Sequence, residues 1–199
     1  MRSTGTLVIV FIVLVVGFAG CAGCNTYNGL VSQEEGVEQA WANVETSYQR
    51  RADLIPNLVR TVQGAADFER ETLEAVTNAR ARATSINLSA SDLSDPEAMQ
   101  AYMAAQSALG SSLGRLIAVA ESYPQLTATT AFRDLQTQLE GTENRINVAR
   151  RDYNGAVRVY NTKVRQFPGS IIASSIGFER RTPFEAEAGA ENAPTVEFN

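Results

Sequence analysis

The sequence predicts an all-α fold, an antiparallel up-and-down bundle of three to four long helices preceded by one N-terminal transmembrane or signal-anchor helix. Three observations lead to this prediction. An uninterrupted apolar run lies near the amino terminus, heptad stripes cover most of the remainder, and no stretch alternates long enough to predict a strand. Because each amphipathic helix has one apolar stripe to bury, packing against antiparallel neighbours is the simplest arrangement.

The 199 residues divide into three parts by composition. We expect residues 1–24 to be a membrane anchor, residues 25–178 to form the helical bundle, and residues 179–199 to be an acidic tail. The tail is rich in Glu, Ala, Pro and Gly and carries little apolar surface that folding could bury. We therefore expect it to be disordered.

The anchor is predicted from charge and hydropathy. Arg2 is the only charged side chain before Glu34, and residues 7–24 form an 18-residue run of apolar and small side chains. That length is at the lower limit for a helix that crosses a bilayer. Because the basic residue precedes the run, the positive-inside bias places the body outside the cytoplasm, with a single pass through the membrane.

A lipid anchor is the alternative to a retained span. Phe18-Ala19-Gly20-Cys21 resembles a bacterial lipobox, in which the cysteine is lipidated after cleavage, although phenylalanine replaces the usual leucine. A basic start, a short apolar core and small residues also describe a secretory signal. We favour the retained span. In the lipid-anchor alternative, Cys21 is the candidate lipidation site. Both alternatives hold the body at a membrane surface.

The body carries three helical stripes. The first stripe consists of Val37, Trp41, Val44, Tyr48, Ile55, Leu58, Val62 and Ala65, with Arg51 at one position where an apolar residue is expected. We expect its helix to continue to Ala83 and to kink at Pro56. A second helix follows Pro96, with Ser94 and Glu97 at capping-box spacing, and Tyr123-Pro124 breaks it. The last stripe runs from Phe132 to Phe167 and stops at Pro168-Gly169.

A short apolar patch follows the last stripe. It comprises Ile171, Ile172, Ile176 and Phe178, and it is too short to span a bilayer. We expect it either to pack on the end of the bundle or to touch the membrane.

Composition excludes several classes of function. The chain has no histidine, its only cysteines are Cys21 and Cys24, and 17 basic against 22 acidic residues give a formal net charge of −5. Histidine triads and histidine metal sites are therefore excluded, and a dedicated nucleic-acid binder is not expected. We predict no enzymatic activity, no cofactor and no metal site. A carboxylate site for magnesium or calcium ranks third among the hypotheses.

Polar residues on the apolar stripes are the candidate functional positions. Arg51 is predicted to form an interhelical ion pair with Glu143 or Asp134, or else to contact an anionic partner group. Asp53 and Asn57 flank Pro56 on one face, where they either satisfy backbone groups that the proline frees or join Gln49 and Arg50 in a polar recognition patch.

A second polar set lies on the last helix. Asn154 and Asn161 are seven residues apart, as are Tyr153 and Tyr160. The tyrosines are expected in the core, and the asparagines are interpreted as a polar seam that sets helix pairing.

Residues 48–59, which read YQRRADLIPNLV, resemble the signature of the LemA family. So do residues 27–31, Ala40-Trp41, residues 61–64, residues 121–124, residues 142–147, the Tyr-Asn pairs at 153 and 160, and residues 167–169. Ala65-Ala66 departs from the family, which often has an aromatic residue there. The resemblance implies a membrane-anchored bacterial protein with an antiparallel helical bundle and no established enzymatic activity. One family member is associated with shaping the magnetosome membrane.

These observations lead to two functional hypotheses. The first is a non-enzymatic, membrane-anchored scaffold or adaptor in the bacterial cell envelope, which organises membrane or docks envelope proteins. The second is an extracytoplasmic sensing or ligand-binding module that uses the polar patch of Gln49, Arg50, Arg51, Asp53 and Asn57. The expected partners are the membrane and an envelope protein, and the heptad stripes also permit a homo-oligomer.

Overall fold

The computed structural model describes residues 2–64 and 68–185. Within these ranges all regular structure is helical, which confirms the predicted all-α class. The elements are α1 (Arg2–Gln63), α2 (Arg70–Ser85), the 3₁₀ turn η1 (Ser91–Ser94), α3 (Pro96–Ala120), α4 (Pro124–Thr127), α5 (Thr130–Arg165) and α6 (Gly169–Ile176).

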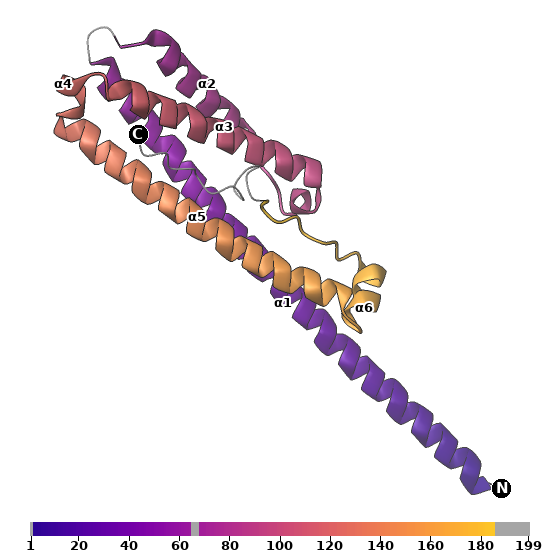
Figure 1. The fold of residues 1–199 in the computed structure, drawn as a ribbon. Coiled ribbons are helices and arrows are strands. Elements are labelled where there is room, and N and C mark those ends of the chain that lie inside the picture. Colours follow the sequence, from indigo (N-terminus) through magenta and orange to yellow (C-terminus); the bar gives the residue numbers. More distant parts are fainter. Residues whose placement is uncertain (1, 65–67, 186–199) are drawn as a thin grey trace, which may run out of the picture.

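The four longest helices run in alternating directions (Figure 1). α1 and α5 lie antiparallel along much of their lengths and form the most extensive helix pair, while α2 and α3 form a second pair. The second pair packs against the half of α1 that is farther from the amino terminus (Figure 1). α6 contacts both α1 and α5 near the opposite end of the bundle.

The core consists of two clusters stacked along the bundle. The cluster nearer α6 is rich in aromatic side chains and includes Trp41, Tyr102 and Tyr153. The other cluster is mainly aliphatic and includes Ile55, Leu58 and Leu113. Seven of the apolar residues in the first predicted stripe are buried, namely Val37, Trp41, Val44, Tyr48, Ile55, Leu58 and Val62; Ala65 lies outside the described residues.

The first stripe belongs to two helices and not to one. α1 continues through Pro56 but ends at Gln63, with Gly64 in a turn, and α2 returns antiparallel to it (Figure 1). Glycine weakens a helix because it loses more backbone freedom than other residues on folding. The hairpin lets Val62 and Val76 enter the same cluster, which a continuous rod would have separated along its axis. The apolar period survives the break, and so the sequence pattern did not reveal it.

The cap of α3 also differs from the prediction. Asp95 is the N-cap, and its carboxylate accepts a hydrogen bond from the Glu97 backbone N–H at 2.9 Å. Pro96 occupies the first helical position, as predicted. Because proline disfavours helical geometry in the residue before it, Asp95 is extended and must be the cap, which excludes Ser94.

The beginning of α1 projects beyond the bundle (Figure 1). It contains an 18-residue window with a mean hydropathy of 2.8, none of which is buried. Among the described residues this is the one helix with the length and composition to cross a membrane, properties that an N-terminal signal sequence shares. Cys21 and Cys24 are free and exposed on this projection.

The C-terminal region is more ordered than predicted. Ile171 and Ile176 of α6 are exposed, whereas Ile172 and Phe178 pack against the aromatic cluster. The chain then runs extended to residue 185, and Phe184 is buried in that cluster. The expected disorder therefore does not apply to residues 179–185, because Phe184 has apolar surface to bury. Residues 186–199 of the predicted tail lie outside the described residues.

Candidate functional site

The polar residues that the sequence singles out surround the middle of α1. Arg51 is buried between α1, α3 and α5, with its side chain 5% exposed. Its Nη1 donates to Glu143 Oε2 at 3.1 Å, and its Nη2 donates to the backbone oxygen of Gln106 at 3.0 Å and to Gln106 Oε1 at 2.8 Å. The guanidinium also lies 5.0 Å from the centre of the Tyr48 ring. The ion pair with Glu143 is thus present, whereas Asp134 is not its partner.

Arg51 and Gln106 together connect all four long helices. Gln106 belongs to α3, and its Nε2 donates to the Ala83 carbonyl of α2 at 3.2 Å. The chain of contacts therefore runs from α5 through Arg51 of α1 and Gln106 of α3 to α2. Glu143 is 49% exposed, so water weakens its attraction to the guanidinium. The buried hydrogen bonds to Gln106 are therefore the stronger part of the network.

Arg80 satisfies the backbone group that Pro56 frees. Proline has no N–H, so the carbonyl four residues earlier, on Ala52, loses its helical donor. Arg80 Nε of α2 donates to this oxygen at 2.8 Å. Of the two interpretations of Asp53 and Asn57, the structure does not show the one in which they satisfy this carbonyl. Asp53 accepts from Gln49 Nε2, Asn57 accepts from Arg60, and both side chains are exposed. Sequence analysis missed Arg80, although the orphaned carbonyl was a signal that some donor was needed.

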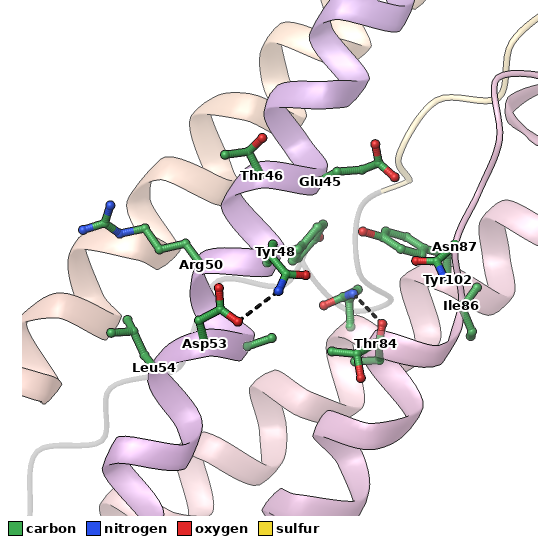
Figure 2. Close-up of a pocket in the computed structure, with 14 residues that line it drawn as sticks. Glu45, Thr46, Tyr48, Arg50, Asp53, Leu54, Thr84, Ile86, Asn87 and Tyr102 are labelled. Atoms are coloured by element: carbon green, nitrogen blue, oxygen red, sulfur yellow. Dashed lines mark hydrogen bonds between the residues drawn. The ribbon is translucent and has the colours of Figure 1, made fainter.

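A pocket of about 660 Å³ lies between α1, α2 and α3 (Figure 2). Of the predicted patch, Gln49, Arg50 and Asp53 line it, and Gln49 Nε2 donates to Asp53 Oδ1 at 2.9 Å. In the close-up Arg50 points away from Tyr102 and Asn87 (Figure 2). Asn57 does not line the pocket and accepts a hydrogen bond from Arg60. The structure therefore divides the patch between the pocket, the buried network and the surface.

The pocket contains groups suited to binding. Glu45, Tyr102, Thr84 and Asn87 contribute a carboxylate, hydroxyls and an amide. Burial raises the pKa of the Glu45 carboxyl, and burial together with the neighbouring Tyr48 and Glu45 raises the pKa of Tyr102. Tyr102 is therefore a neutral hydrogen-bonding group at physiological pH. In the described ranges, no three Cys, Asp or Glu side chains lie close enough together to hold a metal ion.

The sequence model of the LemA family matches residues 40–198. The chain belongs to the LemA family. Two relatives with similar coverage illustrate its range. Magnetosome protein MamQ 2 of Paramagnetospirillum magneticum is 28% identical over 96% of this chain and 75% of its own length. Protein LemA of Metamycoplasma hominis is 23% identical over 89% of this chain and 77% of its own length.

A third relative extends the comparison. Magnetosome protein MamQ of Magnetospirillum gryphiswaldense is 28% identical over 85% of this chain and 68% of its own length. None of these LemA-family relatives is named for an enzymatic activity. Together with the exposed apolar start of α1, membership of the LemA family favours a membrane-associated protein.

Proposed function

We propose that this LemA-family protein is a membrane-anchored, non-enzymatic helical scaffold or adaptor in the bacterial cell envelope. One observation carries the proposal. The exposed apolar run belongs to the same helix as the core stripe of α1, which spans 62 residues from Arg2 to Gln63. At about 1.5 Å per residue this helix is about 93 Å long, of which residues 25–63 supply about 59 Å beyond the apolar run. A continuous helix transmits orientation, so the bundle would stand at a defined angle to the bilayer.

The body is proposed to lie outside the cytoplasm with the apolar run as a single span. Arg2 precedes this run and the next basic residue is Arg50, which favours a cytoplasmic start under the positive-inside bias. A lipidated Cys21 is the alternative anchor. Processing there would leave α1 without its first 19 helical residues, and the mass of the mature amino terminus distinguishes the two forms.

Fractionation and protease accessibility test this proposal. In cells that produce the full chain, the protein should sediment with membranes and remain there after an alkaline carbonate wash. Protease added to spheroplasts should degrade the bundle, whereas protease should not reach it in intact cells. Recovery of the intact protein in the soluble fraction would contradict the anchor. Protection of the bundle in spheroplasts would contradict the extracytoplasmic orientation but not the membrane anchor.

The adaptor role requires a partner, and the face around Gln49 and Asp53 is one place to look for it. A photo-crosslinking residue in place of the exposed Gln49 should capture an envelope protein in living cells. The matched control replaces Val148, which is 47% exposed on α5. Capture at both positions alike would indicate random collision and not docking.

The second candidate function is ligand binding in the pocket between α1, α2 and α3. The observation that favours it is the pocket itself, because about 660 Å³ lies within the range of small-molecule sites. Asp53→Asn together with Gln49→Ala should abolish binding of a small envelope compound without lowering the melting temperature, since both side chains are exposed. Arg51→Ala should lower the melting temperature and leave such binding unchanged.

A further inference from the structure

Residues 181–185, which we call the C-terminal strap, are extended. Asparagine side chains of α5 form the hydrogen bonds to the strap backbone that a neighbouring strand would form in a sheet. Asn161 Nδ2 donates to the Arg181 carbonyl at 2.8 Å, and its Oδ1 accepts from the Arg181 N–H at 2.9 Å. Asn154 repeats this arrangement with Phe184, at 2.9 and 2.8 Å. Each side-chain amide thus pairs with one backbone residue as a peptide group would. The sequence predicted that these asparagines set helix pairing. In the structure both side chains instead bind the backbone of the strap.

The spacing of the two asparagines matches an extended chain. Seven residues of α5 rise about 10.5 Å, and three residues of an extended or polyproline-type segment cover about 9–10 Å. Between the two pairs, the Thr182 N–H donates to the Leu93 carbonyl at 2.8 Å and the Thr182 carbonyl accepts from the Tyr153 hydroxyl at 2.9 Å. Pro183 is exposed and has no N–H to satisfy. These contacts recognise backbone and therefore do not depend on side-chain identity.

Two side chains supply the sequence preference. Arg181 Nη2 bonds Glu34 Oε1 at 2.7 Å, its Nη1 bonds Ser94 Oγ, and its guanidinium lies 5.8 Å from the centre of the Tyr160 ring. This site selects a basic group.

Phe184 is 5% exposed and fills an aromatic site. It stacks on Trp41 with ring centres 6.0 Å apart and meets the edge of Tyr153 at 5.4 Å. The Arg150 guanidinium lies 4.9 Å from the centre of the Phe184 ring. The groove between α1 and α5 therefore reads an arginine followed three residues later by an aromatic residue.

The strap satisfies its groove incompletely. In the described part of the chain, four buried side-chain polar atoms lack a hydrogen bond of normal length, and two of them face the strap: Trp41 Nε1, beside the Glu45 carboxylate, and Tyr160 Oη, beside the Glu34 carboxylate. Buried polar atoms without a full hydrogen bond reduce the stability of the state in which the strap occupies the groove. The strap is connected to α6 through Gly177, whose φ of 92° is left-handed, and through the exposed Glu179 and Arg180. A segment with acceptor groups close to Trp41 Nε1 and Tyr160 Oη would pair these two atoms of the groove more fully than the strap does.

We propose that the groove between α1 and α5 is a binding site for an extended peptide segment of another protein, which carries an arginine and, three residues later, an aromatic residue. The strap occupies this site in cis as an intramolecular competitor. The inference rests on the proposed adaptor function and deepens it by giving the chemistry of the partner. Peptide binding and membrane fractionation are separate measurements, so either can fail while the other succeeds.

The test uses the full-length chain in detergent and a labelled synthetic peptide of residues 179–185, ERRTPFE, with blocked ends. Arg181→Ala with Phe184→Ala weakens the strap and leaves the groove intact. We expect the peptide to bind this variant at least about tenfold more tightly than the wild-type chain, because a tethered competitor acts at high effective concentration. Adding Asn154→Ala and Asn161→Ala should abolish binding. Asn147→Ala is the matched control, an exposed asparagine one heptad earlier on α5, and it should change nothing.

Three results with the peptide would overturn the proposal. They are no binding to the weakened variant, binding that survives loss of both asparagines, and equal binding of a peptide in which the arginine and phenylalanine are alanine. A dimer with exchanged straps would identify a second copy as the occupant and would also overturn it. If the weakened variant does not fold, hydrogen exchange of the wild-type chain decides. Excess peptide should then accelerate exchange of the Arg181 and Phe184 amides, and unchanged rates would contradict displacement.

Discussion

At the scale of single residues, Arg51 shows how a charge is accommodated in an apolar stripe. Its guanidinium is buried, but its three hydrogen bonds leave only Nε without a partner. Glu143 is half exposed and can be replaced in part by water, whereas Gln106 is buried. The two partners should therefore respond very differently to substitution.

We predict that Arg51→Ala lowers the free energy of unfolding by about 2–4 kcal/mol, through lost hydrogen bonds to a charged group and a residual cavity. Glu143→Gln should cost less than about 1 kcal/mol, because a solvent-exposed partner contributes little. Urea denaturation of both variants measures the difference. Equal losses would mean that the ion pair, and not Gln106, holds the guanidinium.

The pair of Pro56 and Arg80 gives a second residue-scale prediction. Arg80→Met removes the donor to the Ala52 carbonyl and should cost about 1–2 kcal/mol. In a Pro56→Ala background the restored N–H can satisfy that carbonyl, so the same change should cost about 1 kcal/mol less. A double-mutant cycle in urea measures the coupling. Strict additivity would show that the arginine stabilises the helix pair by packing alone.

At the scale of elements, α5 has an aromatic face that packs in the core and also contacts the strap. Tyr153 and Tyr160 are buried on this face, and Tyr102 of α3 lies in the same cluster. Burial is the main cause that raises the pKa of each, and it raises the pKa of Tyr160 to about 12. Loss of the Tyr153 proton would also remove its hydrogen bond to the Thr182 carbonyl.

We predict alkaline unfolding within a defined pH window. A tyrosine whose pKa is higher in the folded than in the unfolded chain binds its proton more tightly when folded. Its contribution to stability is complete below the unfolded pKa of about 10 and is lost as pH rises through the folded value, about 12 for Tyr160. Tyrosinate absorbance and circular dichroism should change together over this window. Ionisation of these three tyrosines near pH 10 in a chain that remains helical would contradict their burial.

At the scale of the whole molecule, the sequence predicted the helical class because apolar spacing is a local property of the chain. Val37, Trp41 and Tyr48 are buried as the heptad stripe required. The turn after Gln63 was missed because Val76 and Ala83 continue the stripe after the chain reverses. The strap was missed because its bonds join residues about 20–30 positions apart, Asn161 with Arg181 and Asn154 with Phe184. Nothing local in the strap sequence signals those partners.

The division between projection and bundle leads to the last prediction. The buried apolar core begins at Leu30, and none of the described side chains between Gly5 and Cys24 belongs to it. Deletion of these residues should release the protein from membranes and leave the helical signal per residue and the melting temperature of the bundle nearly unchanged. A melting temperature lower by more than a few degrees would show that the projection is part of the folded unit.

Cys21→Ser separates the two forms of attachment in the same assay. A helix that crosses the bilayer is held by its apolar length, which one sulfur atom does not change, so the variant should remain in the membrane fraction. A lipoprotein depends on the cysteine for its acyl chains and would be released or would keep its uncleaved signal. Release of the variant, or a shift in the mass of its amino terminus relative to the wild-type chain, would show that a lipid on Cys21, and not a transmembrane span, attaches the protein to the membrane. The long α1 would then begin at Cys21, and a flexible acyl tether would no longer fix the angle of the bundle to the bilayer.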